Sequence, residues 1–307
     1  MIKEAIIVGG GPSALTAALY LGRYGIQTSL ITENFGGQTI VAGSIENFPG
    51  FLEIDGFDLI QKMKDQVEKQ ENVELISESK VKKITESKSG FKVLTDSGEY
   101  ETKSVLIAAG KSPRKLGIEN EEDLVGKGVS YCATCDGPLA KGRAVVVAGG
   151  GYAATEAALI LSKLANSVTI INNSRSLNCD RKIISNIEER KNIKVVCSSK
   201  ISAINKKDGV LTGVKYMGVS EKVAKDLNAK MLFVEIGQKP NSETFANFVD
   251  LNERGEIIID PKSCETSRKG VFAAGDITDV LYKQIVIASG EGAKAAISIN
   301  KYLEKTF

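Results

Sequence analysis

Two segments of this 307-residue chain share one residue pattern, and this repeat limits the possible folds more than any other feature. Residues 4–33 read EAIIVGGGPSALTAALYLGRYGIQTSLITE, and residues 143–172 read RAVVVAGGGYAATEAALILSKLANSVTIIN. Each segment begins with an apolar strand-like run, passes through three glycines into an Ala- and Leu-rich helix, and ends in a second β-rich run. This order predicts a βαβ unit that occurs twice, about half a chain apart.

The glycine turn of each unit has the spacing of a dinucleotide-binding motif. The first glycine allows a tight turn, the second lets the backbone approach a pyrophosphate, and a third small residue lets the helix pack closely on the strand. The helix N-terminus then faces the pyrophosphate with its amide groups. Glu33 ends the second strand of the first copy, where an acid can bind the ribose hydroxyls. The motif residues of the two copies are Gly9, Gly11 and Ala14, and Gly149, Gly151 and Ala154.

The two units predict an α/β fold with two Rossmann-like dinucleotide-binding domains, the second inserted into the first. Pro-containing polar stretches at 111–115 and 237–243 flank the second unit and predict linkers. We therefore expect residues 1–113 and 242–307 to form one domain, and residues 114–241 to form the other. Near the C-terminus, a short buried strand with a Gly-Asp turn is expected within GVFAAGDITD, followed by a helix in YKQIVIASGEGAKAAISINKYL.

Composition excludes several classes of function. Hydrophobic residues make up 42% of the chain and charged residues 25%, as in ordinary globular proteins. The formal net charge of +2 predicts no nucleic-acid partner. No apolar run reaches the roughly 20 residues of a membrane helix, so we expect no membrane partner. The N-terminal residues contain neither a long apolar segment nor a cleavage site, so we expect a cytoplasmic location.

The chain contains five cysteines and no histidine. The absence of histidine excludes Ser-His-Asp and Cys-His catalysis and histidine-ligated metals. Cys132 and Cys135 form a C-x-x-C, but the scattered Cys179, Cys197 and Cys264 offer no second such motif for a structural zinc site. We interpret these three as packing residues. The spacing of the pair favours a disulfide that opens and closes by thiol–disulfide exchange.

Asp136 follows this pair at once. An Asp-Gly dipeptide often does no more than form a turn. Beside a redox pair we favour a general acid and base, because no imidazole is available and partial burial can raise the pKa of a carboxyl group toward neutrality.

Taken in order, the motifs GGGPSA, GGQ, ENFPGF, YCATCDG, GGGYAATEAA, VFAAGDITD and YKQ make the chain similar to the low-molecular-weight thioredoxin reductases, which are flavoproteins. The resemblance runs from residue 4 to about 303. It implies FAD in the first domain, NADPH or NADH in the second, a homodimer, and thioredoxin or a small glutaredoxin-like protein as partner. It also implies that Asp276 holds the ribityl chain and that Gln284 lies beside the flavin. The residues matching the family's FAD site are Gly9, Gly11, Ala14, Glu33, Gly36, Gln38, Asn47, Gly110, Asp276 and Gln284.

The resemblance also implies a role for each residue of the redox motif. Cys135 faces the flavin, Cys132 attacks the protein substrate and forms the mixed disulfide, and Asp136 protonates the departing thiolate. Two electrons then pass from a donor through FAD and the Cys132–Cys135 disulfide to a disulfide of a thioredoxin-fold protein.

The second nucleotide site departs from the family. NADPH-dependent members carry a His-Arg-Arg cluster and a further Arg that neutralise the 2′-phosphate, and these positions fall here on Asn172, Asn173, Ser174 and Asn178. An NAD-specific site favours an acid where Asn172 stands. Tyr152 replaces a small polar residue after the glycines, where it is expected to crowd the pyrophosphate.

The donor therefore stays open between NADPH, NADH, and reduced ferredoxin or a deazaflavin. The retained glycine motif favours a nicotinamide nucleotide. Two other functions also stay open. One is the reductase partner of a peroxiredoxin, a group that CDGPL resembles and that usually carries an extra N-terminal redox domain. The other is a flavin-binding redox sensor without turnover.

Overall fold

The computed structural model describes residues 2–40, 44–221 and 223–306, and the side chains of Ser44 and Cys135 also lie outside the described part. The chain divides into two compact units. Unit 1 contains Met1–Ser112 and Lys239–Phe307, and unit 2 contains the continuous segment Pro113–Gln238. From the sequence, we expected the chain to enter the second domain after residue 113 and to re-enter the first domain at residue 242.

A mixed sheet forms the centre of unit 1. In the described part its order is β5-β2-β1-β8-β7-β6, and β19 pairs with β8. Strands β5, β2, β1, β8 and β19 are parallel neighbours, whereas β6 and β7 join β8 as an antiparallel extension. A short hairpin of β3 (Ser44–Ile45) and β4 (Ile54–Asp55) lies apart from it. The sheet strands are β1 (Lys3–Val8), β2 (Thr28–Ile31), β5 (Val73–Ile76), β6 (Val81–Ser87), β7 (Gly90–Thr95), β8 (Glu99–Ile107) and β19 (Val271–Ala273).

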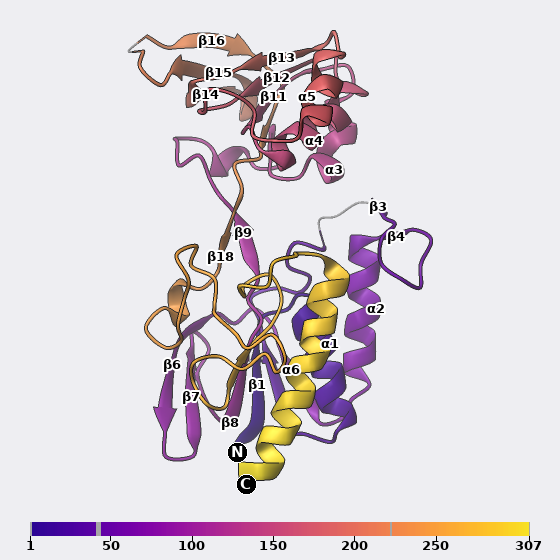
Figure 1. Cartoon of the computed structure of the whole chain (residues 1–307), viewed down its shortest axis with the longest axis vertical. Helices are drawn as coiled ribbons and strands as arrows, with labels where there is room; N and C mark the ends of the chain where they lie inside the picture. The colour runs from indigo at the N-terminus through magenta and orange to yellow at the C-terminus, as the bar shows by residue number, and fades with distance from the viewer. Residues whose placement is uncertain (1, 41–43, 222, 307) are drawn as a thin grey trace. The chain divides into compact units, whose positions relative to one another are not determined.

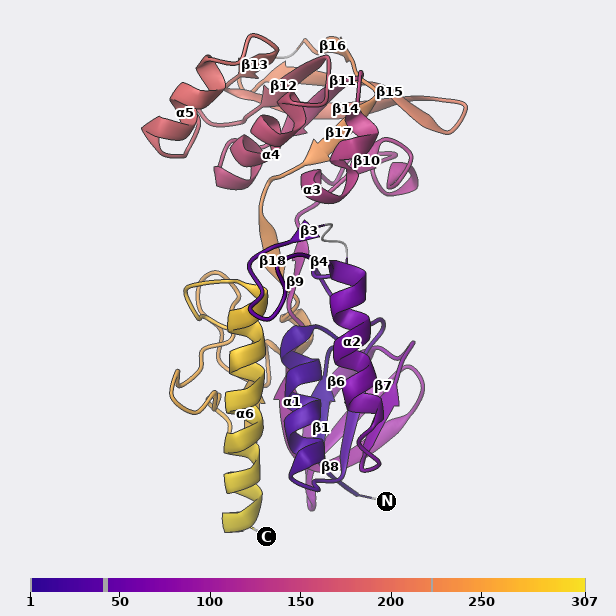
Figure 2. The ribbon, with the colours of Figure 1, turned by 90° about the vertical axis from the view of Figure 1, so that its right-hand side faces the viewer.

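Helix α1 (Pro12–Arg23) lies between α2 (Gly56–Glu68) and α6 (Ile285–Thr306), as Figures 1 and 2 show. Small buried side chains on α1 allow this close packing. The two helices approach closely at Gly292 of α6, where a Cβ atom would lie 2.1 Å from the carbonyl oxygen of Ser13. The position of α1 therefore depends on a glycine in α6.

Unit 2 contains two sheets. Its parallel sheet has the order β10-β17-β11-β12-β13, and its antiparallel sheet has the order β14-β15-β16. Helices α4 (Tyr152–Ser162) and α5 (Arg181–Glu188) pack side by side (Figure 1), and α3 (Ala133–Asp136) is a single turn. The strands are β10 (Val129–Ser130), β11 (Ala144–Ala148), β12 (Ser167–Ile171), β13 (Ile193–Val196), β14 (Ser199–Lys207), β15 (Val210–Gly218), β16 (Lys225–Asn228) and β17 (Met231–Val234).

The two faces of the parallel sheet in unit 2 follow strand alternation. Val147 and Phe233 belong to the core cluster that includes the alanines of α3 and α4. Val146 and Leu232, one residue away, belong to the cluster formed with the antiparallel sheet. Because both faces are covered, β11 and β17 are apolar throughout.

The chain passes between the units through β9 (Lys111–Pro113) and β18 (Gln238–Pro240), which pair with each other. Short 3₁₀ turns complete the described elements at Glu122–Leu124, Gly137–Ala140 and Glu243–Phe245. None of the helices in the described ranges is both long and apolar enough to cross a lipid bilayer.

Candidate functional site

The first glycine turn connects β1 to α1. Gly9 has φ +121°, and a Cβ atom there would lie 2.3 Å from the carbonyl oxygen of Ala108, so a side chain cannot be accommodated. Gly11 is different, because no described atom lies within 4 Å of its Cβ position. Ala14 is fully buried. The turn is thus closed toward the sheet and open at Gly11, as the approach of a pyrophosphate requires.

Helix α1 begins at Pro12, and its N-cap residue Gly11 supplies no side-chain hydrogen bond to the first turn. The first amide groups of an α-helix have no partner within the helix. These amides and the helix dipole fit the diphosphate of a dinucleotide. The residues present in unit 1 therefore fit FAD at this end of α1.

Other expected FAD-site residues lie where parallel strands end. Glu33 follows β2, Gly110 follows β8, and Asp276 follows β19. Gly36 has φ +103°, and its N–H donates to the carbonyl oxygen of Gly10 over 2.8 Å, which closes the segment after β2 onto the glycine turn. Ligands of α/β sheets bind outside the carboxyl ends of their strands. The fold thus brings these positions to the same edge of the sheet.

Two hydrogen bonds join expected site residues to distant segments of unit 1. Gln38 donates through Nε2 to the carbonyl oxygen of Lys111 over 3.3 Å. Asn47 donates through Nδ2 to Oε1 of Gln284 over 3.1 Å. Gln284 immediately precedes α6. Glu33 forms an exposed ion pair with Lys80 at 3.0 Å, and its contact with a ribose stays a prediction.

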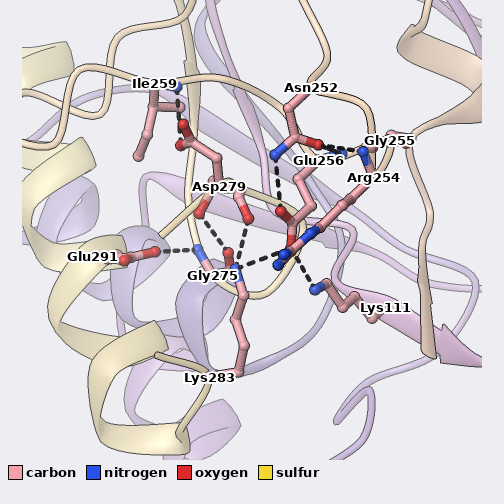
Figure 3. Close-up of polar contacts among 12 residues, drawn as sticks. Lys111, Asn252, Arg254, Gly255, Glu256, Ile259, Gly275, Asp279, Lys283 and Glu291 are labelled. Carbon is pink, nitrogen blue, oxygen red and sulfur yellow. Dashed lines mark hydrogen bonds and ion pairs between the residues drawn. The ribbon is translucent and has the colours of Figure 1, made fainter. Parts of the chain in front are cut away.

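A charged cluster next to this edge was not expected from the sequence (Figure 3). Lys111 Nζ lies 2.7 Å from Oε1 of the buried Glu256, and Lys283 Nζ lies 3.8 Å from the same atom. Lys283 also donates to the carbonyl oxygen of Thr278 over 2.6 Å. Burial raises the pKa of Asp276, while Lys283 and Lys111 act in the opposite direction. The two lysines thus favour the ionised form of the carboxyl group expected to hold the ribityl chain.

Glu291 of α6 is a second residue that the sequence did not reveal. Its side chain is buried and accepts a hydrogen bond from the N–H of Gly275 over 2.7 Å (Figure 3). Burial raises the pKa of Glu291, and the Gly275 N–H partly opposes that shift. This bond fixes the turn immediately before Asp276. The available signal was an acid between small apolar residues in GEGAKAA.

The second glycine turn connects β11 to α4 in unit 2. Gly149 has φ +132°, and a Cβ atom there would lie 2.2 Å from the carbonyl oxygen of Glu235. Gly151 is the N-cap of α4 and has no described atom within 4 Å of its Cβ position. Ala154 is fully buried. The backbone of this turn therefore has the same closed and open sides as the first.

The side chain of Asn172 is engaged within its own loop. Its Nδ2 donates to the carbonyl oxygen of Ser176 over 2.8 Å, and its Oδ1 accepts from the N–H of Ser174 over 3.2 Å. A Cβ atom on Gly150 would lie 2.2 Å from Asn172 Cγ, so the loop closes directly onto the glycine turn. Asn178 adds a backbone bond of 2.7 Å to the carbonyl oxygen of Gly150. Asn172 thus shapes the loop at the position where an NAD-specific site favours an acid.

Tyr152 is half exposed, and its hydroxyl is hydrogen-bonded to the carboxylate of Asp180. This bond raises the pKa of Tyr152, with a smaller contribution from burial. Asn173 and Ser174 are exposed in the same loop as Arg175. Arg175 is therefore an exposed cation in the loop that follows β12.

The redox motif begins at Cys132, two residues after β10, and continues through the single turn of α3. Cys132 is disulfide-bonded, whereas the Cys135 side chain lies outside the described part, so their pairing stays a prediction. Ser130 Oγ accepts from the N–H of Cys132 over 3.1 Å and donates to its carbonyl oxygen over 3.2 Å. Asp136 is half-buried, and its N–H donates to the carbonyl oxygen of Cys132 over 3.1 Å. A short, well-bonded turn thus holds Cys132 and Asp136 close together in sequence and space.

The remaining three cysteines, Cys179, Cys197 and Cys264, are free. Cys264 is fully buried, and burial raises the pKa of its thiol to about 12, which makes it an unreactive packing residue.

Two further acids near the redox motif were not found from the sequence. Glu121 accepts a hydrogen bond from the Tyr131 hydroxyl, and Glu235 accepts one from the N–H of Ala133.

Comparison with known proteins gives a consistent result. A family model described as pyridine nucleotide-disulphide oxidoreductase matches residues 3–292. The F subunit of the alkyl hydroperoxide reductase of Pseudomonas aeruginosa is 36% identical over 307 residues, which cover 99% of this chain and 58% of that protein. The protein of the same name in Escherichia coli is 36% identical over 306 residues, with the same coverage. The chain thus spans 58% of the length of these curated relatives.

Solved structures match along nearly the whole chain. The thioredoxin reductase of Lactococcus lactis superposes with a TM-score of 0.83 at 32% identity, and 99% of each chain is covered. The thioredoxin reductase of T. acidophilum superposes with a TM-score of 0.80 at 32% identity and with the same coverage.

Proposed function

The chain belongs to the pyridine nucleotide-disulphide oxidoreductases, and from this premise we propose that it reduces the disulfide of a thioredoxin-fold protein. Two electrons would pass from a nicotinamide nucleotide through FAD and the Cys132–Cys135 disulfide. The observation that carries the proposal is the disulfide-bonded Cys132 in a turn that also contains Asp136. Likeness to two thioredoxin reductases over 99% of the chain supports the choice of substrate class.

Unit 1 would hold FAD. Gly9, Gly11 and the first amides of α1 would bind the diphosphate, and Asp276, fixed through Gly275 and Glu291, would bind the ribityl chain. Bound FAD supplies two-electron transfer between the nicotinamide donor and the protein disulfide.

The substrate step is a thiol–disulfide exchange at Cys132. Its thiolate attacks one sulfur of the substrate disulfide, a mixed disulfide forms, and the other substrate sulfur leaves as a thiolate. Asp136 would protonate that thiolate, because it lies in the same turn and no histidine is present in the chain. Cys135 then attacks the Cys132 sulfur of the mixed disulfide, which releases the reduced substrate and restores the Cys132–Cys135 bond.

The donor is proposed to be NADPH or NADH, held at the second glycine turn. The open side of Gly151 and the uncapped start of α4 support a dinucleotide there. Arg175, which is exposed in the loop after β12, is a cation that would favour a 2′-phosphate. Asn172 is engaged in its own loop and offers no carboxylate to a ribose diol.

An anaerobic titration tests the donor. FAD-loaded protein receives NADPH, NADH or chemically reduced ferredoxin in separate runs, and flavin absorbance is followed. Rapid bleaching by either nicotinamide is expected. Reduction by ferredoxin but by neither nicotinamide would contradict the donor proposal and leave the disulfide chemistry in place.

A trapping experiment tests the substrate side. Cys135→Ser should leave Cys132 able to attack thioredoxin but unable to release it. A mixed disulfide should therefore accumulate, which is visible on a non-reducing gel and is cleaved by a reducing agent. Cys132→Ser is the matched control and should trap nothing. Trapping by the control alone would reverse the assigned roles of the two cysteines.

A second candidate is the reductase partner of a peroxiredoxin. The observation that favours it is 36% identity with the F subunit of alkyl hydroperoxide reductase, of which this chain spans 58%. The two functions are separated by the trapping experiment with different baits. A small redox domain that reduces a peroxiredoxin, but not thioredoxin, would be captured if this second function holds.

The proposal includes a homodimer and a cytoplasmic location, both implied by the resemblance to thioredoxin reductases. Sedimentation equilibrium and cell fractionation test them separately.

A further inference from the structure

Glu235 directly follows β17. It lies beside two turns of unit 2, the glycine turn at Gly149 and the redox turn that begins at Cys132. Its N–H donates to the carbonyl oxygen of Ala148 over 2.8 Å. Its own carbonyl oxygen is the atom that excludes a side chain from Gly149. The main chain of Glu235 is therefore packed against the nucleotide-binding turn.

The side chain of Glu235 reaches the redox motif. Strand β17 runs parallel to β10, with Phe233 opposite Ser130. Phe233 faces the cluster in which Ala133 is packed, and alternation places Glu235 on the same side two residues later. Its carboxylate accepts a hydrogen bond from the N–H of Ala133, the residue that follows Cys132.

This amide is special because it is the first of α3 and has no partner within the helix. An amide at a helix start ordinarily helps to stabilise a neighbouring thiolate. Here the acceptor is the carboxylate of Glu235, which directly follows β17, about 100 residues later in the chain. Glu235 thereby brings a negative charge to the backbone next to Cys132.

The surroundings of Glu235 make that charge titrate near neutrality. Burial raises the pKa of Glu235 to about 7, and the Ala133 N–H partly opposes the shift. Among the described residues, no charged side chain contributes to it. The titratable groups on the neighbouring segments are Tyr131, which is bonded to Glu121, and Asp136 at the end of α3.

We propose that Glu235 is a positioning residue of the redox turn, whose carboxylate holds the Ala133 amide and whose charge governs how readily an anionic thiol attacks the Cys132 disulfide. The inference rests on the proposed function only in taking this disulfide as the redox centre. It adds a regulatory group whose charge acts on the thiolate that approaches the disulfide.

The chemistry of reduction shows why this charge matters. A thiolate attacks one sulfur of the disulfide, the S–S bond breaks, and the other cysteine leaves as a thiolate that takes a proton from solvent. A second thiol resolves the mixed disulfide, so that two thiols are oxidised and two cysteines are reduced. A carboxylate at Glu235 repels negative charge at the attack site, whereas the neutral carboxyl group does not.

The test compares an anionic and a cationic reductant. Oxidised, FAD-loaded protein is treated with mercaptoethanesulfonate or with cysteamine between pH 5.5 and 8.5. Reduction is followed by alkylation and mass spectrometry as the appearance of two additional modified cysteines. Rate constants are divided by the concentration of reductant thiolate, so that the titration of the reagent itself drops out.

In the wild type, the rate constant with mercaptoethanesulfonate should fall relative to that with cysteamine by about three- to tenfold as pH rises through 7. Glu235→Gln should remove this fall, because its amide oxygen still accepts the Ala133 N–H but carries no charge. Glu188→Gln changes the charge of an exposed residue in the same unit and should keep the wild-type profile.

Two results would overturn the inference: a ratio of the two rate constants that stays flat with pH in the wild type, or an unchanged profile in Glu235→Gln. The assay contains no nicotinamide nucleotide and no protein substrate. Failure of the donor titration or of thioredoxin trapping would therefore leave a positive result here standing, and the proposed function can likewise succeed while this inference fails.

Discussion

Glu121 is 1% exposed, and its buried carboxylate accepts three hydrogen bonds. Two come from the N–H groups of Leu116 and Gly117, each over 2.8 Å, and one comes from the Tyr131 hydroxyl over 2.9 Å. Burial, together with the bond to Glu121, raises the pKa of Tyr131, so that tyrosine remains a donor at all ordinary pH. Glu121 thus ties the segment after β9 to the residue before Cys132.

Removing the Glu121 carboxylate should destabilise the folded protein. Glu121→Ala leaves three donors without their partner and should lower the free energy of unfolding by about 3 kcal/mol, whereas Tyr131→Phe should lower it by about 1 kcal/mol. Urea titrations measure both. Glu122→Ala removes only an exposed ion pair with Lys115 and should change stability by less than about 0.5 kcal/mol. Equal losses from the two glutamates would refute the role of Glu121.

Residues such as Glu121, Glu235 and Glu256 could not be identified from the sequence. Each owes its environment to a partner that is brought close by the fold, and no local spacing marks it. The turn geometry at Gly9, Gly11, Gly149 and Gly151 could be predicted because it depends on the residues immediately before and after each glycine. The roles of all the expected site residues in binding and catalysis stay predictions.

At the scale of elements, the packing of α6 on α1 depends on one glycine. A Cβ atom on Gly292 would lie 2.1 Å from a backbone oxygen, whereas no described atom lies within 4 Å of the corresponding position on Gly290. Both glycines lie inside the same helix. Substituting each glycine by alanine therefore separates the effect of helix propensity on stability from the effect of helix packing.

Gly292→Ala should lower the free energy of unfolding by about 2 kcal/mol, because α1 must shift to relieve the contact. It should also weaken FAD retention during gel filtration, since α1 forms the start of the diphosphate site. Gly290→Ala should raise stability by about 0.5–1 kcal/mol through helix propensity alone. Unimpaired stability and FAD retention in Gly292→Ala would show that the two helices are not tightly packed.

Both βαβ units and the C-terminal helix were predicted because apolar runs and glycine turns are local signals. The expected helix over residues 282–303 is found as α6, displaced to Ile285–Thr306. The sheet of β14, β15 and β16 was not anticipated. Its hairpin does carry a local signal, since Asp208 and Gly209 have φ +51° and +75°, as in a type I′ turn.

At the scale of the whole molecule, unit 2 is an insertion whose two ends meet. Strands β9 and β18 pair, and Ser112 Oγ donates to Oδ1 of Asn241 over 2.8 Å. The described core of unit 1 combines strands before the insertion with Phe245, Ile257 and Phe272 after it. Unit 1 therefore contains a complete core without the inserted segment.

Unit 1 should fold when Ser112 is joined to Lys239 by a short glycine linker. The spliced protein is expected to bind one FAD, because every expected FAD-site residue belongs to unit 1. Flavin absorbance after gel filtration measures this. Gly9→Ala in the same background is the control and should lose FAD through its 2.3 Å contact with Ala108. A spliced protein that aggregates, or that folds without flavin, would contradict this.

The burial of a few carboxyl groups has a consequence for proton accounting. A chain without histidine has little buffering capacity near neutral pH beyond its α-amino group and thiols. Burial raises the pKa values of Glu235, Asp276 and Glu291, all of which lie at the redox turn or the proposed flavin site. Protons taken up on reduction near pH 7, counted by calorimetry in buffers of different ionisation enthalpy, would therefore report on the reduced cysteines and on Glu235, whose pKa burial raises to about 7.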